Sequence, residues 1–120
     1  MIGGLPGNLF TIPGLQVMSL SFNRLTGPLP LEVTQGSNLG VLRLSNNGFG
    51  GTILPGIDSL RQLKQLDLGF NNFESSLPIE LNLLQQLEWL SLEGNSRLTG
   101  RIPTEFASFS NLGYLSLSST

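Results

Sequence analysis

The sequence predicts an α/β solenoid, in which a repeated unit coils so that its strands form a parallel β-sheet and short 3₁₀ or helical turns lie on the return path. Three observations predict this fold. The motif Leu-x-x-Leu-x-Leu, with Met for Leu once, recurs five times at spacings of 24, 24, 24 and 25 residues. Apolar and variable residues alternate within each copy, as in a strand with one buried face. Asn, Gly and Pro, which favour turns, follow the copies at recurring positions.

The strands stand at the start of each unit. We place the repeats near residues 15, 39, 63, 87 and 112, within a single domain of residues 1–120. Residues 1–14 form a partial N-terminal coil, because Leu5 and Pro6 match Leu29 and Pro30 of the next unit, and the last repeat is truncated. A unit of this length cannot bury its apolar face alone, so neighbouring units must stack and share one core.

Apolar residues spaced by three on the return path predict a 3₁₀ or single helical turn that faces the core. These residues are Leu9 and Ile12, Val33, Ile57 and Leu60, Leu81 and Leu84, and Phe106 and Phe109. Gly36 stands where the second apolar residue of its unit would be. We therefore expect a thin core at Gly36.

One Asn follows each of the first four strands, at Asn23, Asn47, Asn71 and Asn95. A tight turn buries backbone groups that no neighbouring strand can satisfy, and an Asn amide supplies both donors and an acceptor. Stacking of the units should align these side chains in one buried column with a structural role, which we call the Asn ladder.

The pattern L-x-x-L-x-L-x-x-N-x-L-x-G-x-[IL]-P resembles the plant-type leucine-rich repeat over nearly the whole chain. The copies at 39 and 63 depart from it, because Leu54 holds the Pro position and Ser75 holds the Gly position. The resemblance implies a right-handed horseshoe segment with the sheet on its concave side and a 3₁₀, short helical or irregular convex side. It also implies a fragment of a longer array, similar to the ectodomains of receptor-like kinases and receptor-like proteins or to extracellular polygalacturonase inhibitors.

The composition excludes most enzyme classes. The chain has no His and no Cys, so it lacks the commonest general base and metal ligand and any thiolate nucleophile. With 12% charged residues and a net charge of −2, it shows no basic surface for nucleic acid or an anionic membrane. Gly and Pro interrupt the uncharged stretch Met1 to Asn23, so we expect neither a signal peptide nor a membrane span there. We expect no catalysis, cofactor or metal in this chain, although a parent protein could carry a kinase domain elsewhere.

The variable residues beside the strand leucines point outward and define the surface on which a ligand would bind. Trp89 and Tyr114, the single Trp and the single Tyr, share a column on adjacent strands and should touch, because strands lie roughly 4.8 Å apart. Exposed aromatic residues are favoured anchors for protein or carbohydrate partners, although such a pair can also simply shield a sheet edge. The other outward residues that we expect to bind ligand are Val41, Arg43, Gln65, Asp67, Phe70 and Glu93.

Opposite charges on neighbouring strands predict two solvated ion pairs, Arg43 with Asp67 and Lys64 with Glu88. Pairs of this kind contribute ~0–1 kcal/mol each. Hydrolytic catalysis would need two carboxylates across a substrate cleft, and pairing of Asp67 with Arg43 argues against that arrangement.

We therefore expect a non-catalytic recognition module that binds a protein or peptide, with a glycan as the second option. The alternatives are a structural spacer within a longer array and a complete cytosolic scaffold of leucine-rich repeats. The resemblance implies an extracellular or cell-surface location, although the chain has no Cys and no N-x-[ST] sequon; the alternative is cytoplasmic. Because Leu112, Leu115 and Leu117 would lie on an uncapped coil, the chain alone should self-associate or be marginally stable.

Overall fold

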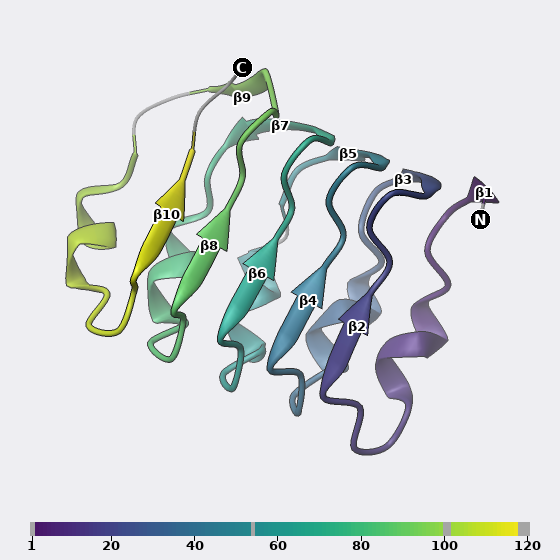
Figure 1. Ribbon diagram of the computed structural model, residues 1–120, viewed down its shortest axis with the longest axis horizontal. Helices are drawn as coiled ribbons and strands as arrows, with labels where there is room; N and C mark the ends of the chain where they lie inside the picture. The colour runs from purple at the N-terminus through teal and green to yellow at the C-terminus, as the bar shows by residue number, and fades with distance from the viewer. Residues whose placement is uncertain (1, 54, 100–101, 118–120) are drawn as a thin grey trace.

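The computed structural model describes residues 2–53, 55–99 and 102–117. Over these ranges the chain winds into stacked coils, and successive coils contribute strands to two sheets and a series of 3₁₀ helices (Figure 1). This arrangement confirms the predicted α/β solenoid.

The main sheet is parallel and takes one strand from each Leu-x-x-Leu-x-Leu copy, in the order β10-β8-β6-β4-β2. Its strands are β2 (Val17–Ser19), β4 (Val41–Arg43), β6 (Gln65–Asp67), β8 (Trp89–Ser91) and β10 (Tyr114–Ser116). Backbone pairing aligns Val17 with Val41 and Trp89 with Tyr114, so the register follows the sequence repeat. We call the solvent-facing side of this sheet the concave face.

A second parallel sheet, the lateral sheet, crosses the edge of the solenoid beyond the Asn ladder. Its strands are β1 (Ile2–Gly3), β3 (Arg24–Gly27), β5 (Gly48–Gly51), β7 (Asn72–Ser76) and β9 (Arg97–Thr99). We expected only turns there, because the strands are short and several end in the Gly that favours a turn. The fourth copy is one residue longer than the others, and the lateral sheet accommodates the extra residue. Gly50 pairs with Asn72, whereas Glu74 pairs with Arg97, which is one residue farther along the chain than the same offset would give.

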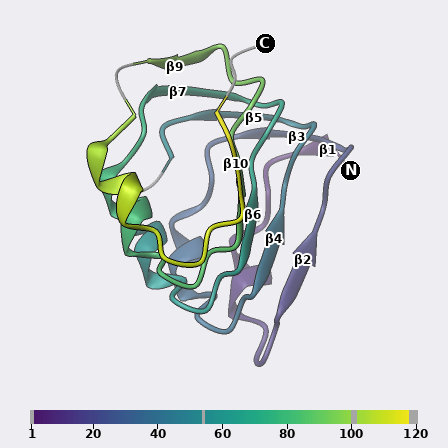
Figure 2. The ribbon, with the colours of Figure 1, turned by 60° about the vertical axis from the view of Figure 1, so that its left-hand side comes forward.

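The 3₁₀ helices lie on the side of the solenoid opposite the main sheet (Figure 2). They are η1 (Gly7–Thr11), η2 (Leu31–Gln35), η3 (Pro55–Ser59), η4 (Ile79–Leu83) and η5 (Thr104–Ser108). Pro6, Pro30, Pro78 and Pro103 occupy the N-cap positions, where the fixed φ of proline suits the start of a tight helix. The predicted 3₁₀ turns are thus confirmed. No helix within the described ranges has the length and apolar character needed to cross a membrane.

A single apolar core fills the space between the sheets and the helices. Leu42, Leu66 and Leu90, at the centres of three main-sheet strands, are fully buried. Leu115 holds the same position in β10 but is 43% exposed, because no strand covers β10 on its outer side among the described residues. Ile12 was expected in the core but is 47% exposed, which corrects that assignment.

The thin core expected at Gly36 is present. A cavity of about 120 Å³ lies beside Gly36, and Phe10, Ile12 and Leu15 are among the residues that line it. Gly36 is the counterpart of Ile12 in the next coil, so Ile12 finds no apolar side chain there. Leu39 fills part of the gap, since its Cδ1 atom lies 2.8 Å from the position that a Cβ of Gly36 would take.

Candidate functional site

The concave face carries the predicted columns of outward side chains. One column is Val17, Val41, Gln65, Trp89 and Tyr114, and the next is Ser19, Arg43, Asp67, Ser91 and Ser116. Phe70 and Glu93 follow the C-terminal ends of β6 and β8. The residues expected to bind ligand therefore share one face of the main sheet.

Trp89 and Tyr114 are in contact, as their register predicted. Their ring centroids lie 4.7 Å apart and the ring planes differ by 6°, so the rings are stacked with nearly parallel planes. Trp89 is half-buried, while Tyr114 is 42% exposed. Stacked aromatic pairs contribute about 0.5–1.5 kcal/mol beyond area burial, so the two rings hold each other in a fixed orientation. The pair forms a rigid apolar platform at the C-terminal half of the concave face.

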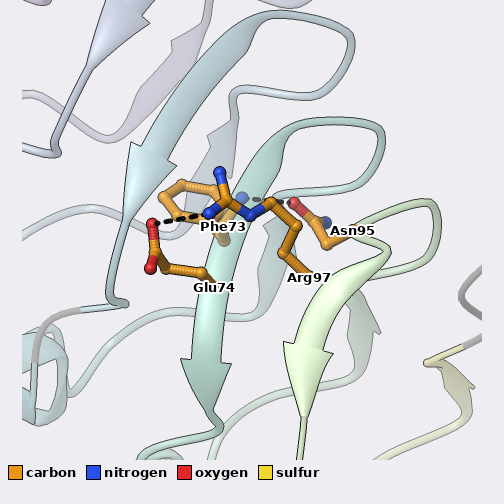
Figure 3. Close-up of polar contacts among 4 residues, drawn as sticks. All are labelled: Phe73, Glu74, Asn95 and Arg97. Atoms are coloured by element: carbon orange, nitrogen blue, oxygen red, sulfur yellow. Dashed lines mark hydrogen bonds and ion pairs between the residues drawn. The ribbon is translucent and has the colours of Figure 1, made fainter.

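The two ion pairs expected on this face are absent from the described residues. Arg43 donates a hydrogen bond from Nη2 to Oε1 of Gln65 at 2.7 Å instead of pairing with Asp67. Lys64 and Glu88 form neither a salt bridge nor a side-chain hydrogen bond with each other. The salt bridge that does form in the described ranges joins Arg97 to Glu74 at 4.0 Å, on the lateral sheet (Figure 3).

Asp67 bonds to the backbone just beyond the end of β6 and not to Arg43. Its Oδ1 atom accepts the backbone N–H of Gly69 at 3.1 Å. Gly69 has no side chain to fill the space beside this carboxylate, so the carboxylate folds over it. Farther along the face, Ser116 Oγ donates to Oε2 of Glu93 at 3.1 Å. Much of the polar centre of the concave face is therefore satisfied internally.

The Asn ladder joins successive coils through side-chain amides. Asn95 Nδ2 donates to the carbonyl of Leu92 in its own coil at 2.9 Å and to that of Leu68 in the preceding coil at 3.0 Å. Its Oδ1 accepts the backbone N–H of Phe73 at 3.0 Å (Figure 3). Asn71 and Asn47 repeat this pattern one and two coils earlier. These side-chain amides thus satisfy backbone groups and join successive coils, which is the structural role expected from the sequence.

The sequence profile of the Leucine Rich Repeat family matches residues 14–35, 38–60, 62–84 and 86–109. The chain belongs to this family. Its leucine-rich repeats are 36% identical over 119 residues to Receptor-like protein 39 of Arabidopsis thaliana, covering 97% of this chain and 13% of that protein. The chain thus spans about an eighth of the length of this relative.

Solved leucine-rich repeat ectodomains share the fold. The ectodomain of the receptor kinase SOBIR1 from Arabidopsis thaliana superposes with a TM-score of 0.91 at 32% identity, covering 99% of this chain and 65% of that one. The Arabidopsis receptor kinase HAESA, solved with the peptide hormone IDA and the co-receptor SERK1, gives a TM-score of 0.80 at 30% identity. That match covers 98% of this chain and 24% of HAESA.

The residue before each Asn of the Asn ladder adopts a left-handed backbone conformation. Phe22 has a φ of 60° and Phe70 a φ of 53°, although bulky residues rarely take this conformation. The Phe70 ring packs on Gly94, while Phe22 is 79% exposed. Phe22 was not among the predicted ligand-binding residues, yet among the described residues it is the most exposed large apolar side chain. The sequence signal that could have identified Phe22 is its position directly before an Asn of the ladder, which Phe70 shares.

The described residues offer no metal site, since no group of three or more acidic side chains converges there. The concave face offers a ligand the stacked rings, the Arg43–Gln65 pair and the carboxylate of Glu93.

Proposed function

We propose that this chain is the ligand-recognition segment of an extracellular receptor-like protein and that its concave face binds a peptide or protein partner. The stacked pair of Trp89 and Tyr114 carries the proposal. A rigid aromatic platform loses little conformational entropy on binding, and Trp and Tyr are enriched among the residues that dominate binding energy. Arg43 on β4 and Glu93 beyond the end of β8 add one charge of each sign to the polar contacts available to a ligand.

The relatives support this role. Receptor-like protein 39 matches almost the whole chain, and the similar HAESA ectodomain was solved with a peptide hormone and a co-receptor. A location outside the cell is part of the same proposal, and the similarity to plant receptor-like proteins and receptor ectodomains supports it. The chain spans only a small part of such proteins, so the role proposed is that of one segment of a receptor.

The test uses a displayed library of random peptides selected on the immobilised chain, with the selected peptides then synthesised and titrated by fluorescence polarisation. We expect Trp89→Ala and Tyr114→Ala each to weaken binding by about 2 kcal/mol, which is roughly thirtyfold. The matched control is Leu31→Ala. Leu31 is 74% exposed but lies on η2, on the opposite side of the solenoid, so this variant should bind normally.

Two outcomes would contradict the proposal. If no peptide is enriched above the level obtained with the double Trp89→Ala, Tyr114→Ala chain, the segment is a structural spacer whose aromatic pair only shields the sheet. If peptides are enriched but lose equal affinity with Leu31→Ala and Trp89→Ala, the binding surface is not the concave face.

A further inference from the structure

A groove of about 400 Å³ lies where β2, β4 and β6 begin, at the N-terminal edge of the concave face. It is separate from the aromatic platform, because neither Trp89 nor Tyr114 lines it. Its floor includes Val17 and Val41, and its walls carry the side chains of Gln16, Asn38, Gln62, Lys64 and Gln86. This size falls within the range of small-ligand sites.

The groove exists because of Gly40. This residue precedes β4 at the position that Gln16 holds before β2 and Lys64 holds before β6, so the middle strand has no side chain there. The backbone does not demand glycine, since the conformation lies outside the left-handed region. A Cβ atom would lie 3.8 Å from Gln16 O and 3.9 Å from Gln62 O, which are ordinary contacts. Gly40 therefore leaves a space between its neighbours that a side chain could fill.

The polar side chains around this space have no partners within the described part of the protein. Gln16, Asn38, Gln62 and Gln86 are exposed, and their amides form no hydrogen bond there. Lys64 has neither a salt bridge nor a hydrogen bond through its ammonium. The centre of the concave face is different, because Arg43, Asp67 and Glu93 are each hydrogen-bonded there. Polar side chains that have no protein partner in the described residues thus line the groove.

We propose that this groove binds an acidic oligosaccharide, a chain of sugars that carries hydroxyls and at least one carboxylate. Each primary amide offers both donors and an acceptor, which is what a hydroxyl requires. The ammonium of Lys64 provides one charge-assisted bond for a carboxylate. From Gln16 to Gln86 the wall crosses three strand spacings, roughly 14 Å, which suits several linked sugars better than a single ring.

The lining favours a sugar over a peptide. Peptide recognition draws most of its affinity from apolar anchors in pockets, and this groove offers only the two Val side chains for that purpose. It also favours an acidic sugar over a polyphosphate, because Lys64 is the one cation among the lining residues. The inference does not depend on the proposed function, since it rests on different side chains.

The experiment measures binding of tetragalacturonate to the isotopically labelled chain by NMR titration, with neutral cellotetraose as the comparison ligand. Gly40→Gln fills the groove with the side chain that Gln16 already places in the neighbouring strand. We expect it to weaken tetragalacturonate binding at least about tenfold. The matched control is Gly113→Gln, which changes the equivalent position before β10, where a Cβ would lie 3.7 Å from Glu88 O. That variant should bind normally.

Charge is tested with Lys64→Gln, which should weaken tetragalacturonate binding roughly fivefold and leave cellotetraose unaffected. The double Trp89→Ala, Tyr114→Ala chain should bind the uronate like the parent, which separates this site from the aromatic platform. Circular dichroism verifies that each variant is folded.

Several results would overturn the proposal. One is the absence of NMR chemical-shift changes at millimolar tetragalacturonate. Another is equal binding affinity for tetragalacturonate and for neutral cellotetraose. A third is equal weakening by Gly40→Gln and Gly113→Gln, which would place the bound sugar elsewhere. A fourth is tighter, Gly40→Gln-sensitive binding of an acetylated Asp-Gly-Asp-Gly peptide, which would make the groove an acidic-peptide site.

Discussion

Removing one amide of the Asn ladder should weaken the fold far more than its size suggests. Asn95 is 1% exposed and makes four hydrogen bonds, three as donor to the carbonyls of Leu68, Leu92 and Glu93 and one as acceptor from Phe73 N–H. In Asn95→Ala the Phe73 N–H loses its acceptor and the Leu92 carbonyl loses its donor. Both groups lie in the interior, between two coils.

The expected cost follows from these two groups. A buried polar group left without a partner costs about 1–3 kcal/mol, so the free energy of unfolding should fall by about 3 kcal/mol. For a chain of this size that corresponds to a melting temperature lower by about 10 °C. Asn95→Asp should be at least as damaging at neutral pH, because a carboxylate cannot donate to the three carbonyls.

Urea titration followed by circular dichroism measures the change. The matched control is Asn72→Ala, because Asn72 is exposed on β7 and its side chain forms no hydrogen bond among the described residues. We expect the control to change stability by less than about 0.5 kcal/mol. A loss below about 1 kcal/mol for Asn95→Ala, or equal losses for the two alanine variants, would refute the bridging role of the ladder.

Two further predictions concern the backbone and the last coil. Ser75 has a φ of 68° at the position where Gly27 and Gly51 also have positive φ, so Ser75→Gly should relieve strain and raise the free energy of unfolding by about 1 kcal/mol; a lower melting temperature would show that the strain is already compensated. Leu115 is 43% exposed on the open edge of β10, so the 120-residue chain alone should self-associate, and Leu115→Lys should shift it toward monomer in sedimentation velocity. A parent chain that is already monomeric at all concentrations would contradict this second prediction.

The repeat period predicts those contacts that depend only on the position of a residue within its coil. The contact of Trp89 with Tyr114 follows directly, because adjacent parallel strands bring residues one period apart into register. The same holds for Asn95, whose neighbours in the preceding coil are fixed once the units stack. The thin core at Gly36 is also visible in the sequence, since a missing apolar residue leaves its space to its neighbours.

What the period does not predict is the choice among several partners within reach. Arg43 lies beside both Asp67 and Gln65, and it bonds to Gln65, while Asp67 accepts the backbone N–H of Gly69. The left-handed backbone conformation of Phe22 is equally hard to predict from the sequence, because Phe rarely adopts it. Such outcomes depend on competing contacts of similar energy, and only the assembled surface shows which contact forms.

The sequence by itself determined that this chain is a stack of coils with a leucine core and an Asn ladder, because burial and backbone satisfaction impose the same requirement on every unit. The tertiary structure alone decided where polar side chains remain free to bind. The side chains at the centre of the concave face satisfy one another, whereas those around Gly40 do not, since a missing side chain on one strand separates its neighbours. That difference arises between coils, so no single repeat contains it.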